Sequence, residues 1–307
     1  MHVAVCCITF RRPEGLSRLL EGLNGLVFAK TQEPKVTVVV VDNDSAAPMR
    51  ALVKSFRLTF RWSLLYDCEP AQGLSNARNR ALDLVPPDAE CIASIDDDEV
   101  PLPGWLDELL YVRRTHGAPI VQGPVRPHFV SPPRRWLIRG RFFELGPYQD
   151  GASLHYGYTS NSLIDAAMVR GLRLRFDPRF GRTGGEDQHF FGRAIAAGHQ
   201  VVTAERALVY EWIPASRTTL QYLLRRKFRM GTTLTMIDRI EGGKARLTVR
   251  ALKGTGRIAL GVAQVVSVVP RGFAGLATAL CTMAWGAGNL VGLFGVTLCE
   301  YGSADDL

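Results

Sequence analysis

The chain has 307 residues, which is enough for one large or two small domains with a substantial buried core. Its 37 Lys and Arg against 29 Asp and Glu give a net charge of +8, which favours anionic partners such as nucleotide phosphates, nucleic acid or anionic lipid. The six cysteines include no CxxC pair, so neither a zinc site nor a disulfide framework is expected. The apolar run His2–Phe10 is too short for a signal peptide and lacks a cationic lead, which favours a reducing, cytosol-like compartment.

The first 112 residues alternate between strand and helix patterns. Compact apolar runs predict strands at His2–Thr9, Lys35–Val41, Trp62–Tyr66 and Cys91–Ile95. Amphipathic spacing predicts helices beginning at Pro13 and spanning Pro48–Phe56, Ser75–Leu84 and Leu106–Val112. The second strand is apolar at successive positions, which indicates burial on both faces, as in a parallel sheet covered by helices. We therefore expect an α/β fold with right-handed connections.

The pattern loosens from Pro119 to Pro147, where prolines, basic residues and aromatics predict an irregular excursion over one end of the sheet. Order returns at Tyr156–Ile164. Beyond it, the sequence predicts a helix at Asp187–Ala197 and strands at Gln200–Ala204 and Leu208–Trp212.

The composition changes after this last strand. Residues 217–257 form a basic amphipathic region whose only acidic residues are Asp238 and Glu241. Ile258–Val269 and Gly272–Leu298 then contain no charged residue, and the second is long enough to cross a bilayer. Basic residues before apolar ones match the positive-inside rule, so 217–257 is expected beside a membrane and 258–298 as membrane-associated helices. A buried helical pair in a soluble domain is the alternative. Residues 1–216 would form the main α/β domain.

Three consecutive aspartates, Asp96, Asp97 and Asp98, follow the strand expected at Cys91–Ile95. Crowded carboxylates repel one another and lose hydration, so a cation should compensate them. Mg²⁺ or Mn²⁺ suits such oxygens, especially when substrate phosphates complete the coordination shell. The alternative is an acidic turn in which Asp97 and Glu99 are solvated. The end of a strand in an alternating pattern favours the metal site, because ligands gather at the carboxyl ends of such strands.

Other polar clusters also follow strands or begin helices. Asp42 to Ser45 end the second strand with groups suited to a ribose or a base edge. Gly73 leads into a helix whose Arg78 can contact an anion, unless it is a surface arginine. Glu186 and Asp187 follow two glycines at an expected helix start, where the helix dipole favours acids. Either of these acids can also be only an N-cap.

With these motifs in place, the chain resembles the family 2 inverting glycosyltransferases of the GT-A fold, closest in style to bacterial exopolysaccharide-type enzymes. The resemblance runs from about Val3 to Trp212. It rests on six segments that occur in the family's order: CITFRRPEGL, VVVVDNDS, GLSNARNRAL, ASIDDDEVPLPGWL, GYTSNSLI and GGEDQHFFGRAIAAG. A GT-A, Rossmann-like sheet, mixed but mostly parallel and flanked by helices, is the fold that this resemblance implies for residues 1–216.

The resemblance implies roles for the matching positions. Thr9 and Arg11 would line the nucleotide pocket, Asp42 and Asn43 would hold the base and ribose, and Arg78 would lie near the diphosphate. Many relatives have a second aspartate where Asn43 stands. The full set expected to bind the nucleotide-sugar is Thr9, Arg11, Asp42, Asn43, Arg78, Asp96 and Asp97.

The acidic residues would divide the chemistry between them. Asp96 and Asp98 form a DxD-like motif, with Asp98 the more direct ligand of Mn²⁺ or Mg²⁺ and Asp96 nearer the ribose. Asp187 would be the general base, and Glu186 would orient it or bind the acceptor. One acid group for the metal and another for the base predicts a single displacement with inversion.

The resemblance thus implies transfer of one sugar from a nucleotide-diphospho-sugar, with a UDP-sugar favoured, to a glycan or lipid-linked acceptor at the cytoplasmic face of the cell membrane. The Gln-x-x-Arg-Trp motif of processive synthases is not met after Gln221, which favours single additions. Trp105 and Trp212 could stack on acceptor sugars, although large aromatics are more often core. A sugar-phosphate nucleotidyltransferase and a non-catalytic membrane scaffold are the alternatives. Nucleic acid is not expected as a partner, because the basic charge gathers beside the apolar tail.

Overall fold

The computed structural model describes residues 1–144, 146 and 149–299. The chain forms two compact units. The first unit comprises Met1–His128, Glu144–Gly181 and Glu186–Trp212, and the second comprises Phe129–Phe143, Arg182–Gly185 and Ile213–Leu307.

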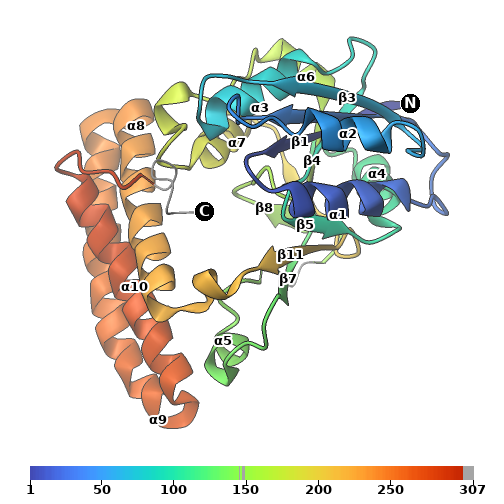
Figure 1. The fold of residues 1–307 in the computed structure, drawn as a ribbon. Helices are drawn as coiled ribbons and strands as arrows, with labels where there is room; N and C mark the ends of the chain where they lie inside the picture. The colour runs from blue at the N-terminus through green and yellow to red at the C-terminus, as the bar shows by residue number, and fades with distance from the viewer. Residues whose placement is uncertain (145, 147–148, 300–307) are drawn as a thin grey trace. The chain divides into compact units, whose positions relative to one another are not determined.

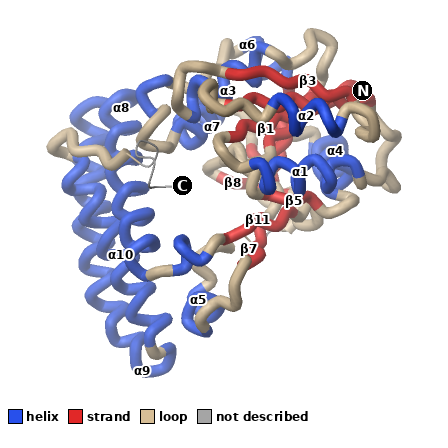
Figure 2. The backbone as a smooth tube through the Cα atoms, viewed as in Figure 1, coloured by secondary structure: helices blue, strands red, loops and turns tan. Residues whose placement is uncertain are grey.

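An eight-stranded sheet organises the first unit (Figures 1 and 2). In spatial order its strands are β3 (Ser63–Cys68), β2 (Lys35–Asp42), β1 (His2–Thr9), β4 (Cys91–Ser94), β9 (Ser162–Asp165), β6 (Ile120–Gln122), β10 (Val201–Thr203) and β8 (Ser153–Leu154). Strand β1 pairs in parallel with both β2 and β4, while β9 runs antiparallel to β4 and β6. The expected mixed, mostly parallel α/β sheet is therefore confirmed.

Helices cover both faces of this sheet, and the two faces have separate cores. Strand β1 shows why: Val3 and Val5 belong to one core, whereas Ala4 and Cys6 belong to the other. One core takes apolar side chains from α1 (Pro13–Asn24), α2 (Arg50–Phe56) and α4 (Trp105–His116). The other takes them from α3 (Leu74–Asp83), α6 (Ala166–Gly171) and α7 (Glu186–Ala196). Burial on both faces, expected from the continuous apolar runs, is confirmed.

A second sheet has three strands in the order β5 (Glu99–Pro101), β11 (Val209–Ile213) and β7 (Val125–Phe129). Strand β5 begins directly after the aspartate triplet and pairs antiparallel with β11. The prediction of an irregular excursion at Pro119–Pro147 is wrong over much of that range, because it contains β6, β7 and the short helix α5 (Arg135–Gly140). Strands as short as three residues carry too little periodicity to stand out in the sequence. Residues 145 and 147 of this range lie outside the described residues.

The second unit is built on a helical hairpin, drawn in orange and red in Figure 1. It consists of α8 (Leu220–Gln264), a short turn with η3 (Val265–Ser267) and α9 (Val268–Arg271), and α10 (Phe273–Gly292). Gly243, with φ of 59°, interrupts α8. The two long helices approach closely through glycines: a Cβ on Gly286 would lie 2.6 Å from the carbonyl oxygen of Gly254.

The apolar segments expected at the C-terminal end both lie in this hairpin. Within the described ranges, α10 is the one helix that is long and apolar enough to cross a bilayer, judged by length and composition. Within the structure, 44% of its apolar window is buried. Ile258–Val269 instead forms the end of α8, the turn and the start of α9.

Candidate active site

The candidate site lies where the strand order reverses its direction along the sheet. From β1 the chain continues to β2 on one side, whereas β4 lies on the other side. The loops that leave the carboxyl ends of β1 and β4 therefore meet at a switch point, where open α/β sheets bind their ligands. The first loop carries Thr9 to Arg12, and the second carries the three aspartates.

Asp97 joins these two loops. Its two carboxylate oxygens accept hydrogen bonds from Thr9 Oγ1 at 2.8 Å and from Arg12 Nη1 at 2.9 Å. The residue is buried, and this burial raises the pKa of the Asp97 carboxyl to about 6, although the charge of Arg12 lowers it. The alternative of a solvated acidic turn is thus wrong for Asp97. In this structure Thr9 and Asp97 bind each other, and both are almost fully buried.

Asp98 is held by the same arginine and by a backbone contact. Arg12 Nη1 also donates to Asp98 Oδ2 at 2.9 Å, and the backbone N–H of Trp212 donates to the carbonyl oxygen of Asp98 at 2.7 Å. The sequence predicts a role for Arg11 and not for Arg12, although the adjacent pair Arg11-Arg12 at the end of the first strand is the signal that could have indicated both. In the structure Arg12 is the arginine that contacts the aspartates.

The backbone of Asp96 is held by a hydrogen bond to a buried glutamate. Glu99 Oε2 accepts from the backbone N–H of Asp96 at 3.0 Å, and Glu99 is only 2% exposed. Burial raises the pKa of Glu99 well above its ordinary value, and the charge of Asp96 raises it further. Glu99 is therefore a buried support of the aspartate loop and not the solvated acid that the alternative required. Its cross-strand partner in the β5–β11 pair is Glu211.

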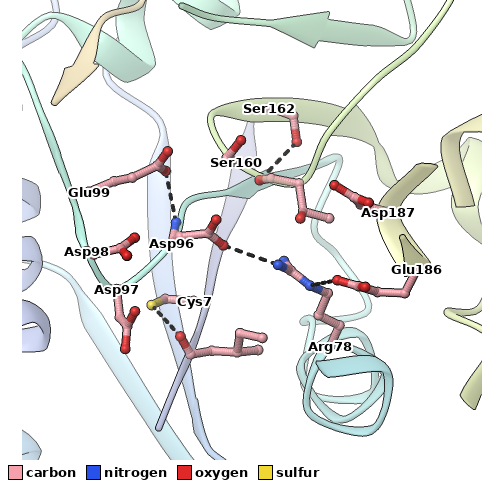
Figure 3. Close-up of polar contacts among 12 residues, drawn as sticks. Cys7, Arg78, Asp96, Asp97, Asp98, Glu99, Ser160, Ser162, Glu186 and Asp187 are labelled. Carbon is pink, nitrogen blue, oxygen red and sulfur yellow. Dashed lines mark hydrogen bonds and ion pairs between the residues drawn. The ribbon is translucent and has the colours of Figure 1, made fainter. Parts of the chain in front are cut away.

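Arg78 connects the aspartate loop to the start of α7 (Figure 3). Its Nη2 donates to Asp96 Oδ1, and its Nε donates to Glu186 Oε1, both at 3.2 Å. Burial lowers the pKa of Arg78, but the charges of Asp96 and Glu186 outweigh that effect and raise it above its ordinary value. The alternative of a surface arginine is wrong, since Arg78 is a mostly buried cation shared by two acids.

Glu186 and Asp187 occupy the first turn of α7, where the helix dipole favours negative charge. The chain enters this turn through Gly184 and Gly185, whose φ angles of 71° and 92° favour glycine. Glu186 is 3% exposed, and burial, followed by the charge of Asp187, raises its pKa to about 7. Among the described residues, none forms a hydrogen bond with its second oxygen, Oε2. Asp187 is half-buried.

The loop after β2 is held together by its own side chains. Asp42 is wholly buried and accepts hydrogen bonds from the backbone N–H groups of Asp44 and Met49 and from Tyr66 Oη. Asn43 donates to the carbonyl oxygens of Glu69 and Ala71, and its Oδ1 accepts from the Gly73 N–H at 2.8 Å. In this structure the Asp42 side chain shapes the loop after β2, the Asn43 side chain ties this loop to the one that precedes α3, and neither presents a well-exposed polar group to a base.

Arg11 points along this same loop. Its Nε donates to Asp44 Oδ2 at 2.7 Å, and this hydrogen bond holds the pKa of Asp44 below its ordinary value. Arg11 is exposed and has a φ of 53°, which is uncommon for a residue with a side chain.

The two tryptophans differ in their surroundings. Trp105 is fully buried, and its Nε1 donates to Asn161 Oδ1 at 2.7 Å, so stacking of Trp105 on a sugar is excluded. Trp212 is half-buried and adjoins the acidic loop through its bond to Asp98. Its ring stacks on His128 with a centroid distance of 4.2 Å, and Arg18 lies over it at 5.2 Å.

The donor set expected for a metal consists of Asp96 and Asp98. Within residues 1–144, 146 and 149–299, no three His, Cys, Asp or Glu side chains are grouped so that they could hold a metal ion. Two carboxylates on one loop nonetheless fit Mg²⁺ or Mn²⁺ when the phosphates of a substrate supply further oxygens. The residues present therefore fit a metal that binds together with a nucleotide.

The family profile described as "Glycosyl transferase family 2" matches residues 4–172, which include both loops of the site. The chain belongs to glycosyl transferase family 2. It is 36% identical over 236 residues to the succinoglycan biosynthesis protein ExoM of Rhizobium meliloti, an alignment that covers 76% of this chain and 74% of ExoM. It is also 25% identical over 251 residues to a glucosyl-dolichyl phosphate glucuronosyltransferase of Haloferax volcanii, covering 78% and 77% of the two chains.

Solved structures show the same fold. The mannosyltransferase PcManGT of Pyrobaculum calidifontis, in complex with GDP-Man and Mn²⁺, has a TM-score of 0.61 at 17% identity, covering 94% of this chain and 86% of that one. TarS of S. aureus, in complex with UDP-GlcNAc, has a TM-score of 0.55 at 14% identity, covering 100% and 95%. The resemblance to bacterial exopolysaccharide-type family 2 enzymes and the GT-A fold are thereby confirmed. The protein is a glycosyltransferase, and the nucleotidyltransferase and scaffold alternatives are not supported.

Proposed function

We propose that this glycosyltransferase moves one sugar from a nucleotide-diphospho-sugar, with a UDP-sugar favoured, to a hydroxyl of a lipid-linked or surface-polysaccharide glycan, with inversion at the anomeric carbon. The observation that carries the proposal is the Arg78 bridge. Arg78 is a buried cation that contacts Asp96, in the loop proposed to hold the donor, and Glu186, at the start of the helix proposed to carry the base.

On the donor side, Asp96 and Asp98 would hold Mn²⁺ or Mg²⁺, with Asp98 the more direct ligand. The bound metal would offset the negative charge of the diphosphate. Arg11 would contact the nucleotide from its exposed position, while Thr9 and Asp97 would keep the aspartate loop in place. Asp42 and Asn43 would shape the border of the base and ribose site. The contacts of Thr9, Asp97 and Asn43 support these roles, and the structural neighbours solved with UDP, UDP-GlcNAc and GDP-Man support a nucleotide-sugar as donor.

On the acceptor side, Asp187 would take the proton of the attacking hydroxyl. The acceptor oxygen forms a bond to the anomeric carbon as the bond from that carbon to the diphosphate oxygen breaks, and the proton ends on the Asp187 carboxylate. Arg78 would release Asp96 and contact the leaving diphosphate instead. This contact would place positive charge where negative charge develops. Glu186, which shares Arg78, would orient Asp187 or bind the acceptor. The half-buried Trp212 beside Asp98 would border the acceptor.

The acceptor and the location belong to the same proposal. The similarity to a succinoglycan biosynthesis protein supports a glycan under assembly as acceptor. The basic and apolar residues of 217–298 support attachment to the cytoplasmic face of the membrane, where a lipid-linked glycan would be reached. The unmet Gln-x-x-Arg-Trp motif after Gln221 supports single sugar addition.

A screen of nucleotide-sugars with Mn²⁺ or Mg²⁺ tests the proposal by measuring released nucleoside diphosphate. We expect release with one donor and a strict need for divalent metal. Pyrophosphate release from a nucleoside triphosphate and a sugar 1-phosphate, with no nucleoside diphosphate from any donor, would contradict the proposal.

Two variants separate the proposed roles. Asp98→Ala should abolish metal-dependent binding of the donor, measured by calorimetry with the nucleoside diphosphate and Mn²⁺. Asp187→Asn should keep that binding but lower transfer to the acceptor by about 10²–10⁴-fold, the usual contribution of a general base. Unchanged turnover in Asp187→Asn would remove this residue as the base.

A further inference from the structure

Two distant segments of the second unit meet at the turn of the α8–α10 hairpin. Arg139 of α5 donates from Nη2 to the carbonyl oxygen of Pro270 at 3.1 Å, across 131 residues of sequence. Trp136 of the same helix packs edge-on against Phe273, the first residue of α10, with 5.3 Å between ring centroids. This end of the unit, with the α9 label in Figure 1, therefore combines the hairpin turn with α5.

Apolar side chains gather in the exposed part of this end. Val266 is 76% exposed and Val269 is 90% exposed. Single exposed apolar residues are normal, but a group of them marks an interaction surface. The tip patch is defined by six exposed residues: Ile138, Val262, Val265, Val266, Val269 and Phe273.

The charge around the tip patch is strongly positive. Residues 217–298 contain twelve Lys and Arg against two acidic residues, so this segment carries a larger net charge than the whole chain. Lys253, Arg271 and Arg139 are exposed on the elements that bear the patch. Apolar side chains together with a basic surround match a membrane surface of anionic lipids. A second copy of this chain would bring the same positive charge, which opposes self-association through this surface.

We propose that the tip patch inserts shallowly into one leaflet of an anionic membrane, at the boundary between headgroups and acyl chains. The inference deepens the membrane partner of the proposed function. Arg271 and Arg139 adjoin the patch, and their long side chains can reach the phosphates while their stems stay in the apolar layer.

Crossing the membrane does not fit this end of the hairpin. Beyond Arg257, α8 continues uncharged only to Gln264, a rise of roughly 10 Å at 1.5 Å per residue, whereas the hydrocarbon core is about 30 Å thick. Helix α10 also packs against α8 through glycines, and 44% of its apolar window is already covered by the protein. The tip therefore lies in the interface, and the hairpin remains outside the bilayer.

Vesicle flotation of the full-length protein tests the inference. Neutral phosphatidylcholine vesicles are compared with vesicles that also contain phosphatidylglycerol. The unaltered protein should float with the anionic vesicles. The partition coefficient of the double variant Val266→Ser, Val269→Ser onto these vesicles should be lower by about tenfold or more. Leu58→Ser is the matched control, because Leu58 is 94% exposed in the first unit and should not affect flotation.

Two further measurements distinguish the outcomes. Lys253→Gln with Arg271→Gln should reduce the preference for anionic over neutral vesicles. Alkaline carbonate should release the bound protein, whereas retention after carbonate would indicate a spanning helix and overturn the shallow mode. Equal flotation of the valine variant and the unaltered protein would also overturn the shallow mode. So would an unaltered protein that binds no vesicles but forms a dimer, if the valine variant is monomeric. Flotation needs no donor or acceptor, so its failure leaves glycosyl transfer untouched, and loss of transfer in Asp187→Asn leaves flotation unchanged.

Discussion

At the scale of single residues, the site depends on how four buried or half-buried acids are compensated. Asp97 and Asp98 share Arg12, and Asp96 and Glu186 share Arg78. Breaking a buried ion pair on one side costs more than the pair contributes, because the remaining charge stays desolvated. Each arginine is therefore needed for the loop that it holds, whatever else it contacts during turnover.

Arg12→Met tests the first of these pairs. We expect the free energy of unfolding at pH 8 to fall by about 1–3 kcal/mol. This loss is smaller than that for breaking a fully buried ion pair, because Arg12 is partly exposed. The loss should be smaller at pH 5, since burial raises the pKa of Asp97 to about 6 and the carboxyl is then largely neutral. Urea denaturation at the two pH values measures both. Arg57→Met, at the exposed end of α2, is the control.

Glu186 makes the free energy of unfolding depend on pH in the opposite direction from an ordinary ion-paired acid. Burial raises its pKa from 4.5 to about 7, so between these values the folded state keeps a proton that the unfolded state has released. The free energy of unfolding therefore falls as pH rises through this window. Glu186→Gln mimics the neutral form and should be more stable than the unaltered protein at pH 8 by roughly 1–3 kcal/mol, with the difference shrinking toward pH 4.5. A constant difference across the range would contradict this assignment.

At the scale of elements, the backbone that carries Arg78 depends on one glycine. Gly73 precedes α3 with a φ of 132°, and a Cβ there would lie 3.2 Å from the carbonyl oxygen of Gly181. Its N–H also donates to Asn43 Oδ1, which ties the loop after β2 to the start of α3. The conformation and the close approach both disfavour any side chain.

Gly73→Ala should accordingly destabilise the protein by about 1–3 kcal/mol and lower turnover, because Arg78 is displaced from Asp96 and Glu186. Thermal unfolding and nucleoside diphosphate release measure the two effects. Gly192→Ala serves as the matched control: that glycine is exposed inside α7 with nothing within 4 Å of the new Cβ, so the helix should gain about 0.5–1 kcal/mol. Equal stability of the two variants would show that the backbone at Gly73 is not strained.

At the scale of the whole molecule, the charge is unevenly distributed along the chain. Residues 217–298 carry a net charge of +10 (12 Lys and Arg against 2 acids), while the rest of the chain, with its acidic site, is close to neutral, with 25 Lys and Arg against 27 acids. Screening by salt weakens attraction between exposed charges, whereas buried pairs such as those of Arg78 are affected much less.

Turnover on an acceptor embedded in anionic vesicles should therefore fall several-fold between about 50 and 500 mM salt. Hydrolysis of the donor, or transfer to a short soluble acceptor, should change much less over the same range. The two rates are compared by nucleoside diphosphate release. Parallel loss of both rates would place the salt effect in the active site and not at the membrane.

The sequence by itself determined the elements of the first unit and the chemistry of its loops. Continuous apolar runs identified strands buried on both faces, and the strand-end positions of Asp96–Asp98 marked the candidate site, because periodicity and strand ends are local properties. Only the tertiary structure decided which groups compensate which charges. Arg12 rather than Arg11 binds the aspartates, Glu99 is buried, and Trp105 belongs to the core. Such contacts join residues far apart in the chain, and α5 reaches the hairpin turn in the same way. Burial and charge pairing depend on which distant segments meet in the fold, and local sequence patterns do not indicate this.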